Sequence, residues 1–165
     1  MSCTINDVIK ELQKFSDEMF EANSPLVEAD LKAFETKYKI LLPTQFVNFL
    51  NTYNGFNLMG NQLMGFMGNE NSIDAVYAKE HGPMPKHVVP VLHDGSGSYY
   101  CLDISENTAE RTETCAVIYW ESGYRYTADD APETVNDSFC EFVKEVFIDW
   151  TLEDYDYEGN EISPS

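Results

Sequence analysis

The sequence predicts an α+β fold, in which a mainly antiparallel sheet of about 4–6 strands is flanked by N-terminal helices and a C-terminal helix. Apolar residues recur at helical spacing before residue 54 and again after residue 136. Between residues 87 and 127, short β-branched and aromatic runs alternate with turn residues, as successive strands do. The short connections between these runs favour antiparallel pairing. At 165 residues, the chain is expected to form a single domain over residues 1–150.

Three helices are expected before the sheet. Thr4 can cap a first helix over about residues 5–20, where apolar side chains recur every three or four positions. Ser24-Pro25 is typical of the start of a second helix, since proline is favoured at the first helical position. A third helix is expected to restart at Pro43 and to end at Asn54-Gly55, where glycine permits the left-handed turn after a helix.

The remaining elements follow from short patterns. Residues 56–68 suggest one or two short strands, and residues 73–79 a short helix. The expected strands of the main sheet are "HVVPVL", "SYYCLDI", "CAVIYW" and "YRYT". The amphipathic stretch "NDSFCEFVKEVFIDW" predicts a last helix, capped by Asn136 or Asp137. Beyond it, residues 151–165 are acidic and aromatic without periodicity, which indicates a loosely attached acidic tail.

The stretch "VLHDGSGSYYCLDIS" places His93, Asp94 and Ser96 close together. A catalytic triad needs a base that reaches the nucleophile, whereas neighbouring side chains of a strand or turn diverge. A phosphate loop would need a lysine and a following helix, and this stretch joins two strands. Asp-Gly and a second glycine instead suit a hairpin turn. We interpret the stretch as a turn and expect no catalytic residues and no enzyme.

Neither a metal nor a cofactor is expected. Asp154, Asp156 and Glu158 match the first, third and fifth positions of a calcium loop, but Ser165 replaces its twelfth-position glutamate. The four cysteines are Cys3, Cys101, Cys115 and Cys140, and none has zinc-site spacing. The last three lie within apolar patterns, which indicates reduced thiols and a cytoplasmic protein. No apolar run is long enough for a membrane helix, and the charged N-terminus does not resemble a secretory signal.

The charge is large and unevenly distributed. The chain has 10 basic and 29 acidic side chains, for a net charge of −19. Residues 1–86 contain 7 basic and 11 acidic groups (−4), and residues 87–165 contain 3 and 18 (−15). Such a field repels nucleic acid and anionic membranes and attracts a basic protein. Solubility alone is the alternative explanation for this charge.

Four sequence blocks in order resemble the SUKH superfamily, the Smi/Knr-like domains. They are "LKAFETKYKILLPTQFVNFLNTYNG", "VPVLHDGSGSYYCLDIS", "CAVIYWE" and "NDSFCEFV", within a match that spans residues 26–147. Val135 departs from the small alanine common in the family, and residues 56–80 do not align. The positions that carry the resemblance are Glu35, Pro43, Asn54, Gly55, Asp94, Gly95, Gly97, Leu102, Asp103, Trp120, Asp137, Ser138 and Phe139.

The resemblance implies helices packed on a mainly antiparallel sheet and no catalytic role for these positions. It also implies one of two functions. Many bacterial members are immunity proteins that neutralise a toxin, often a nuclease, whereas eukaryotic members are regulatory interaction modules. The charge favours an immunity protein whose acidic face binds a basic toxin domain. The expected contributors are Asp129, Asp130, Glu133, Glu153, Asp154, Tyr155, Asp156 and Glu158. The aromatic side chains at 119, 120, 124 and 126 are a further candidate recognition surface, although strand alternation requires part of this set to be core.

Overall fold

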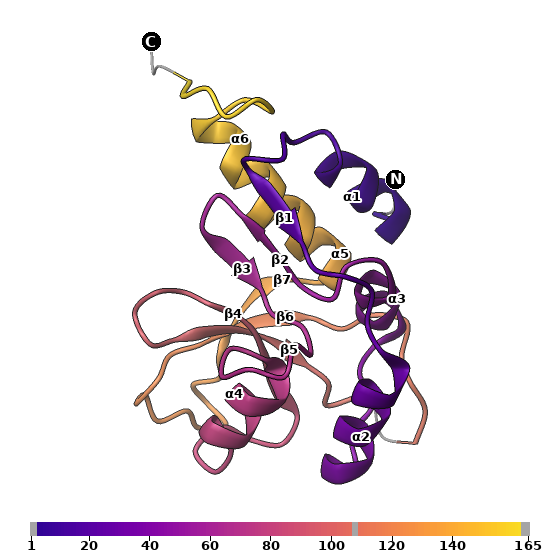
Figure 1. Cartoon of the computed structure of the whole chain (residues 1–165). Helices are drawn as coiled ribbons and strands as arrows, with labels where there is room; N and C mark the ends of the chain where they lie inside the picture. Colours follow the sequence, from indigo (N-terminus) through magenta and orange to yellow (C-terminus); the bar gives the residue numbers. More distant parts are fainter. Residues whose placement is uncertain (1–2, 107–108, 163–165) are drawn as a thin grey trace.

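The computed structural model describes residues 3–106 and 109–162, so residues 1–2, 107–108 and 163–165 of the predicted domain and tail, Ser165 included, lie outside the described residues. The predicted α+β class is confirmed (Figure 1). One antiparallel sheet contains seven strands in sequence order, slightly more than expected. The strands are β1 (Phe20–Ala22), β2 (Phe56–Leu58), β3 (Asn61–Leu63), β4 (Val88–His93), β5 (Tyr99–Asp103), β6 (Val117–Trp120) and β7 (Glu133–Asn136). The helices are α1 (Ile5–Leu12), α2 (Glu28–Tyr38), α3 (Thr44–Thr52), α4 (Ile73–Glu80), α5 (Phe139–Phe142), the π-helical η1 (Val143–Asp149) and α6 (Trp150–Asp154).

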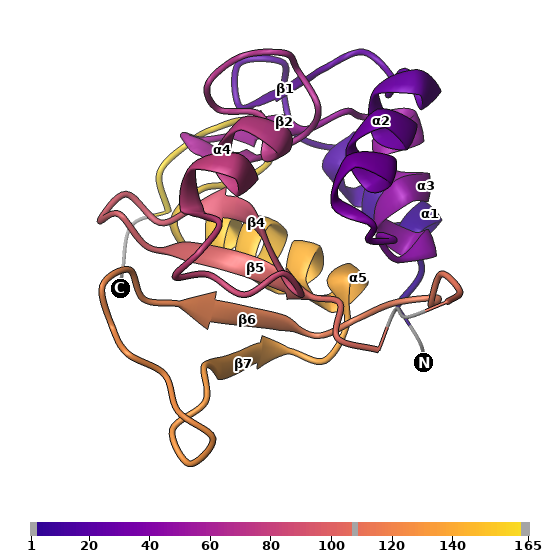
Figure 2. The same cartoon turned by 90° about the horizontal axis from the view of Figure 1, so that it is seen from below.

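Helices cover both faces of the sheet. Consecutive strand residues point to opposite sides, so neighbouring residues of one strand contact different helices. Tyr99 of β5 donates a hydrogen bond from its hydroxyl to Glu80 of α4, at 3.1 Å. Its neighbour Tyr100 instead packs on Phe142 of α5, with ring centroids 5.7 Å apart. Figures 1 and 2 show α4 and the C-terminal helix as separate layers beside the central strands. In the described part of the chain, no helix is both long and apolar enough to cross a membrane.

The C-terminal helix starts later than the sequence suggested. Asn136 is the last residue of β7, and Ser138 caps the helix by accepting a hydrogen bond from the Glu141 amide at 3.1 Å. The expected caps, Asn136 and Asp137, are therefore wrong. α5, η1 and α6 then follow without a break, and the middle segment adopts the rare π conformation, which often marks functional sites.

The segment after Thr151 is attached to the domain. Tyr157 packs on Phe15, with ring centroids 4.9 Å apart, and its hydroxyl donates to Glu11 at 2.9 Å. The Ser16 amide donates to the Tyr157 carbonyl at 2.9 Å. The expectation of a loosely attached tail is therefore wrong for residues 151–162, because a tyrosine anchors the segment beside α1.

Other element boundaries also differ from the sequence pattern. The Thr4 hydroxyl caps the first helix as expected, accepting from the Asp7 amide at 3.2 Å, but that helix ends at Leu12. The second helix begins at Glu28 and not at Ser24-Pro25. The run "YRYT" (124–127) is not a strand; it lies in the long loop before β7. Its aromatic residues satisfied the strand pattern, but they pack on one another and on Trp120.

Two of the four cysteines form a disulfide, which corrects the expectation of reduced thiols. Cys3 precedes α1 and Cys140 lies in α5, and their Cα atoms are 5.9 Å apart. The pairing was hidden because 137 residues separate the two cysteines. In a chain-entropy description, closing a loop of this length stabilises the fold by about 5 kcal/mol. Cys101 and Cys115 remain free thiols, and burial raises the pKa of both.

Candidate functional site

The first group of expected binding residues lies on the loop 121–132 and at the start of β7. Asp129, Asp130 and Glu133 are all exposed. The Tyr124 hydroxyl donates to the Asp130 carboxylate, and this hydrogen bond raises the pKa of Tyr124. Thr127 and Asp130 also exchange backbone hydrogen bonds of 3.2 and 3.1 Å. The loop therefore holds Asp130 in a tight turn and presents Asp129 and Glu133 to solvent.

The second group lies at the C-terminal end, in α6 and just after it. Glu153, Asp154 and Glu158 are exposed, whereas Tyr155 is half-buried against the core. Asp156 closes its own turn: its carboxylate accepts from the Asn160 and Glu158 amides, each at 2.9 Å. These hydrogen bonds, those from Asn160 first, lower the pKa of Asp156. Asp156 is thus a structural residue of the segment that resembled a calcium loop.

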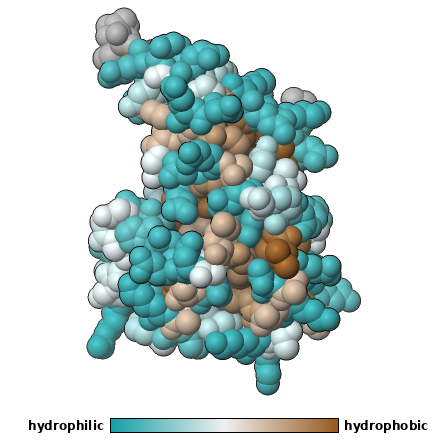
Figure 3. All heavy atoms as spheres, viewed as in Figure 1, coloured by the Kyte–Doolittle hydropathy of each residue, from teal (hydrophilic) through white to brown (hydrophobic). Residues whose placement is uncertain are grey.

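The two groups do not form one acidic face. In Figure 1, α6 and the C-terminal segment are at the top of the molecule, and the loop 121–132 projects at the lower left. Figure 3 shows a hydrophilic surface over the C-terminal end of this face. The eight expected residues therefore make two separate acidic surfaces, and a compact partner would meet only one of them at a time.

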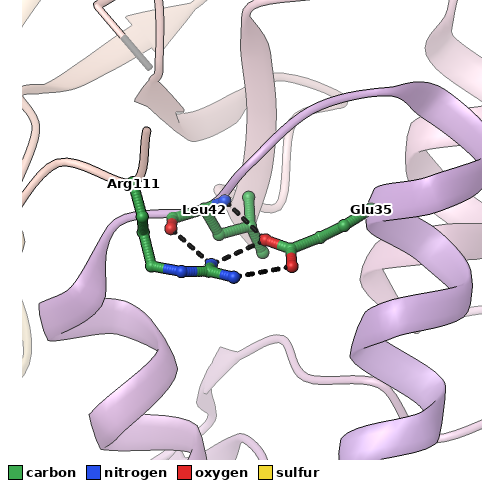
Figure 4. Close-up of polar contacts among 3 residues, drawn as sticks. All are labelled: Glu35, Leu42 and Arg111. Carbon is green, nitrogen blue, oxygen red and sulfur yellow. Dashed lines mark hydrogen bonds and ion pairs between the residues drawn. The ribbon is translucent and has the colours of Figure 1, made fainter. Parts of the chain in front are cut away.

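Glu35, one of the positions that carry the family resemblance, is held by an arginine and by a backbone amide. Arg111 binds both carboxylate oxygens of Glu35, at 2.7 and 2.8 Å (Figure 4). The same carboxylate accepts from the Leu42 amide at 2.7 Å, and Arg111 donates to the Leu42 carbonyl at 2.7 Å. Glu35 thereby joins α2, the start of α3 and the loop before β6. Its role is structural, because its side chain is only 10% exposed.

Asn54 and Gly55 fasten the end of α3 to the segment after β3. The buried Asn54 side chain accepts from the Phe66 amide at 2.8 Å and donates to the Phe66 carbonyl at 2.9 Å. Gly55 has a φ of +88°, and a Cβ there would lie 2.7 Å from the Leu63 carbonyl oxygen. Gly65 is equally constrained, since its Cβ would lie 2.3 Å from the Asn54 carbonyl oxygen. Glycine is therefore required at positions 55 and 65, because a side chain at either would collide with the backbone of the other segment.

The stretch 93–98 is the expected hairpin turn between β4 and β5. The Asp94 amide donates to the Ser98 carbonyl at 3.0 Å, and Gly95 and Gly97 have φ values of +89° and +100°. His93 accepts from the Gly95 amide through Nδ1, whereas Ser96 donates to Asp94. Histidine and serine are thus not paired as base and nucleophile.

Asp94 connects this turn to β6. Burial raises its pKa, but hydrogen bonds from the Tyr119 hydroxyl and from Ser96 and Ser98 outweigh that effect and bring the pKa down to about 2. Asp94 is therefore ionised at neutral pH and holds the turn against β6.

Most of the other positions of the resemblance are buried or lie where an element begins or ends. α3 begins directly after Pro43, Leu102 is fully buried in β5, and Asp103 accepts from the Ser105 amide at 3.0 Å where that strand ends. Trp120 is 8% exposed at the end of β6. At the start of the C-terminal helix, Asp137 is exposed, Ser138 is the cap and Phe139 is buried.

Two hollows flank β7, and the sequence did not reveal either. One, of about 650 Å³, lies where Trp120 and Tyr126 stack with ring centroids 4.5 Å apart. The other, of about 580 Å³, is lined by Tyr119, Glu133 and Trp150 among others. Trp150, the last residue of the amphipathic stretch 136–150, is 43% exposed. Of the aromatic residues at 119, 120, 124 and 126, Trp120 is buried and Tyr124 is exposed, so this set divides between core and surface as expected.

A third hollow, of about 440 Å³, lies between α2 and α4 and is lined largely by alanine and aromatic side chains. Figure 3 shows apolar residues reaching the surface near the centre of the face that it presents.

Among the described residues, no three His, Cys, Asp or Glu side chains are grouped so that they could hold a metal ion.

Comparisons with known proteins place these features in a family. The model of the SMI1 / KNR4 family (SUKH-1) matches residues 25–145. The chain belongs to this family. A similar solved structure is a "protein from Pseudomonas syringae pv. tomato", with a TM-score of 0.60 and 19% sequence identity over 87% of this chain and 98% of that one. At this identity the likeness concerns the fold alone. No curated protein matches the chain significantly.

In this SUKH-1 domain, the family positions therefore build the fold, and the exposed acids and aromatic hollows lie beside them. Glu35, Asn54 and Asp94 each use their polar atoms on neighbouring backbone or side chains. The candidate interaction residues are found instead on the loop 121–132, on β7 and at the C-terminal end. The only sequence indication that Trp150 is exposed beside a hollow was the polar character of its neighbours in the chain.

Proposed function

We propose that this SUKH-1 domain is a non-catalytic protein-binding domain that neutralises a basic toxin domain, such as a nuclease, by covering it with an acidic surface. The charge supports this proposal, because residues 87–165 have a balance of −15 and repel nucleic acid while attracting basic proteins. Family membership adds support, since the resemblance implies immunity proteins among bacterial members. The domain is proposed to meet an incoming toxin in the cytoplasm. This location rests on the family role alone, because the Cys3–Cys140 disulfide removes the argument from reduced thiols.

The observation that carries the proposal is the exposed acidic loop beside β7. Asp129, Asp130 and Glu133 are exposed there, next to Tyr124, which is 46% exposed. Carboxylates can pair with the lysines and arginines of a phosphate-binding cleft, and an exposed tyrosine can bury apolar area at little entropic cost. The C-terminal group ranks second, since Asp156 and Tyr155 already serve the fold.

The regulatory alternative is an interaction module of the Smi/Knr type without a toxin partner. The same family match supports it. The genomic neighbourhood separates the two functions: a gene for a large secreted toxin directly upstream supports immunity, and an isolated gene supports regulation.

Co-expression tests the proposal directly. Where a toxin gene lies directly upstream, the toxin domain that it encodes is produced in a sensitive host with and without this protein, and we expect the toxin-producing host to grow only when this protein is also present. Two matched variants then compare the two acidic surfaces. One carries Asp129→Asn, Asp130→Asn and Glu133→Gln, and the other carries Glu153→Gln, Asp154→Asn and Glu158→Gln.

Each variant removes three negative charges, so non-specific charge effects are matched. We expect the first variant to protect less well than the second. If the unmodified protein neither binds the toxin domain nor restores growth, the immunity function is wrong.

A further inference from the structure

Strand β7 forms an open edge of the sheet. It pairs with β6 on one side, and no other described segment pairs with its outer side. In Figure 2, β7 lies at the border of the sheet, and the loop 121–132 projects beside its first residue. An edge strand directs unpaired backbone N–H and C=O groups outward, where another extended chain can pair with them. β7 is therefore a template for an added strand.

The two hollows described above lie on opposite faces of this edge. Thr134 pairs with Ile118 and Glu133 pairs with Tyr119, so these neighbouring residues of β7 point to different faces. Ile118 lines the hollow at Trp120, Glu133 and Tyr119 line the hollow at Trp150, and Thr134 borders both. A strand added along β7 would likewise direct alternate side chains toward the two hollows.

The hollow at Trp120 suits an apolar, aromatic or proline side chain. Tyr126 packs between Trp120 and Tyr124 with tilted rings, whose centroids are 4.5 and 4.8 Å apart. Pro83, Pro85 and Pro132 add rigid apolar surface to a lining that also contains His87, Asp103 and Arg125. Such surfaces bind apolar groups with little loss of side-chain entropy.

The hollow at Trp150 suits a lysine or an arginine. Asp94, Glu133 and Glu145 line it together with Tyr119 and the exposed Trp150. Carboxylates bind ammonium or guanidinium groups by charge-assisted hydrogen bonds, and an exposed indole adds a cation–π contact. The two hollows thus differ in the residue type that each would accept.

We infer that β7 binds an extended segment of a partner protein as an additional strand, with an apolar or aromatic residue entering the hollow at Trp120 and an adjacent lysine or arginine entering the hollow at Trp150. In this mode main-chain hydrogen bonds provide affinity and alternate side chains provide specificity. The inference rests on the proposed function, because the segment is taken to belong to the same basic partner. A second copy of this chain fits poorly, since it would bring Glu133 and a net charge of −19 against the same acidic edge.

Peptide selection on the unmodified full-length protein tests the inference without any toxin. The probe is a displayed library of random peptides of about ten residues, long enough to pass β7 and both hollows. We expect the enriched sequences to alternate basic and apolar residues, and the bound peptide to slow amide hydrogen exchange in residues 133–136. Failure to enrich such peptides, or protection of another segment, would overturn the inference.

The two tryptophans of the chain report on the hollows separately. In the Trp120→Phe variant, peptide binding should change the emission of Trp150, and in the Trp150→Phe variant it should change the emission of Trp120. Glu133→Lys should weaken peptide binding at least about tenfold, whereas the matched charge reversal Glu153→Lys on α6 should leave it unchanged. Equal losses for the two charge reversals would contradict docking at β7.

The outcomes also separate this inference from the proposed function. If selected peptides protect β7 but the toxin domain is not neutralised, the function fails and the docking mode stands. If the toxin is neutralised while its binding leaves exchange in residues 133–136 unchanged, the docking mode is wrong and the function stands.

Discussion

Two acidic regions of the molecule use the same types of side chain, aspartate and glutamate, in different ways. At the junction of α2 and α3, Glu35 is 10% exposed, and its two oxygens are occupied by Arg111 and the Leu42 amide. On the loop before β7 and at the start of that strand, Asp129 and Glu133 are exposed. The first region is neutralised and fixed within the fold, whereas the second retains its charge at the surface.

The difference shows how a chain of net charge −19 can be both stable and interactive. A shielded carboxylate costs desolvation energy and stabilises the fold only when every oxygen has a partner. An exposed carboxylate contributes little to stability, but it shapes the electric field that a partner encounters. Structural acids therefore differ from candidate binding acids in the burial and the hydrogen-bond partners of their carboxylates, and not in residue type.

Removing the shielded acid should have the largest effect. Glu35→Ala leaves Arg111 and the Leu42 amide without their partner, and we expect a loss of about 2–4 kcal/mol in the free energy of unfolding. Urea unfolding measures it. Asp149→Ala is the matched control, because it breaks the exposed pair with Lys144 and should cost about 0–1 kcal/mol. Equal losses in the two variants would erase the distinction between the regions.

Exchanging the basic partner should have an intermediate effect. Arg111→Lys keeps the positive charge but loses the two-pronged contact with Glu35 and the bond to the Leu42 carbonyl. We expect about 1–2 kcal/mol of destabilisation by urea unfolding. Arg125→Lys, on the exposed loop, should change stability by less than about 0.5 kcal/mol. If Arg111→Lys left the free energy of unfolding unchanged, positive charge alone, without the geometry of the guanidinium, would hold the junction.

Asp94 is intermediate in burial between the shielded and the exposed acids. Its contribution to stability should be visible when the pH is lowered. Its pKa in the folded protein is about 2, below the ordinary value of 3.8, so its contribution to stability is complete above the ordinary value and is lost as the pH falls toward 2. Tyr119→Phe removes one hydrogen bond to the carboxylate and should reduce this acid-dependent loss. Because Asp94 is only partly buried, the change should stay below about 1 kcal/mol.

Urea unfolding at a series of pH values between about 5 and 2 measures this change. In an Asp94→Asn background, Tyr119→Phe should no longer alter the pH dependence. If it still does, the effect does not pass through Asp94.

Neutralising the exposed acids should have the smallest effect on stability. The variant Asp129→Asn, Asp130→Asn, Glu133→Gln should unfold within about 0.5 kcal/mol of the unmodified protein. Thermal and urea unfolding provide the measurement. A loss of several kcal/mol would show that these acids are also structural, and would remove them as candidates for binding.

The local sequence pattern predicted the fold class well, but not the contacts between distant segments. The Thr4 cap was predicted correctly, and the end of α3 at Thr52 was predicted to within a few residues by Asn54-Gly55, because caps and turns depend on adjacent residues. The Glu35–Arg111 pair joins positions 76 residues apart, and no local pattern indicates it.

The edge strand was missed for a different reason. β7 has the sequence Glu-Thr-Val-Asn, which lacks an apolar pattern, and only its pairing with β6 identifies it as a strand. The aromatic run 124–127 was stronger by pattern, yet it lies in a loop. Likewise, Tyr157 anchors the C-terminal segment through contacts with Phe15 and Glu11, which are distant in sequence. Of the expected binding residues, the sequence located the acids but not their division into two surfaces.

The central claim is that the acids beside β7 bind a basic partner. The most direct measurement is the salt dependence of the affinity for the upstream-encoded toxin domain, compared between the unmodified protein and the Asp129→Asn, Asp130→Asn, Glu133→Gln variant. We expect the variant to bind at least about tenfold more weakly at low salt and to show a flatter dependence on salt concentration. Equal affinities and equal slopes would show that the acidic edge is not the interface.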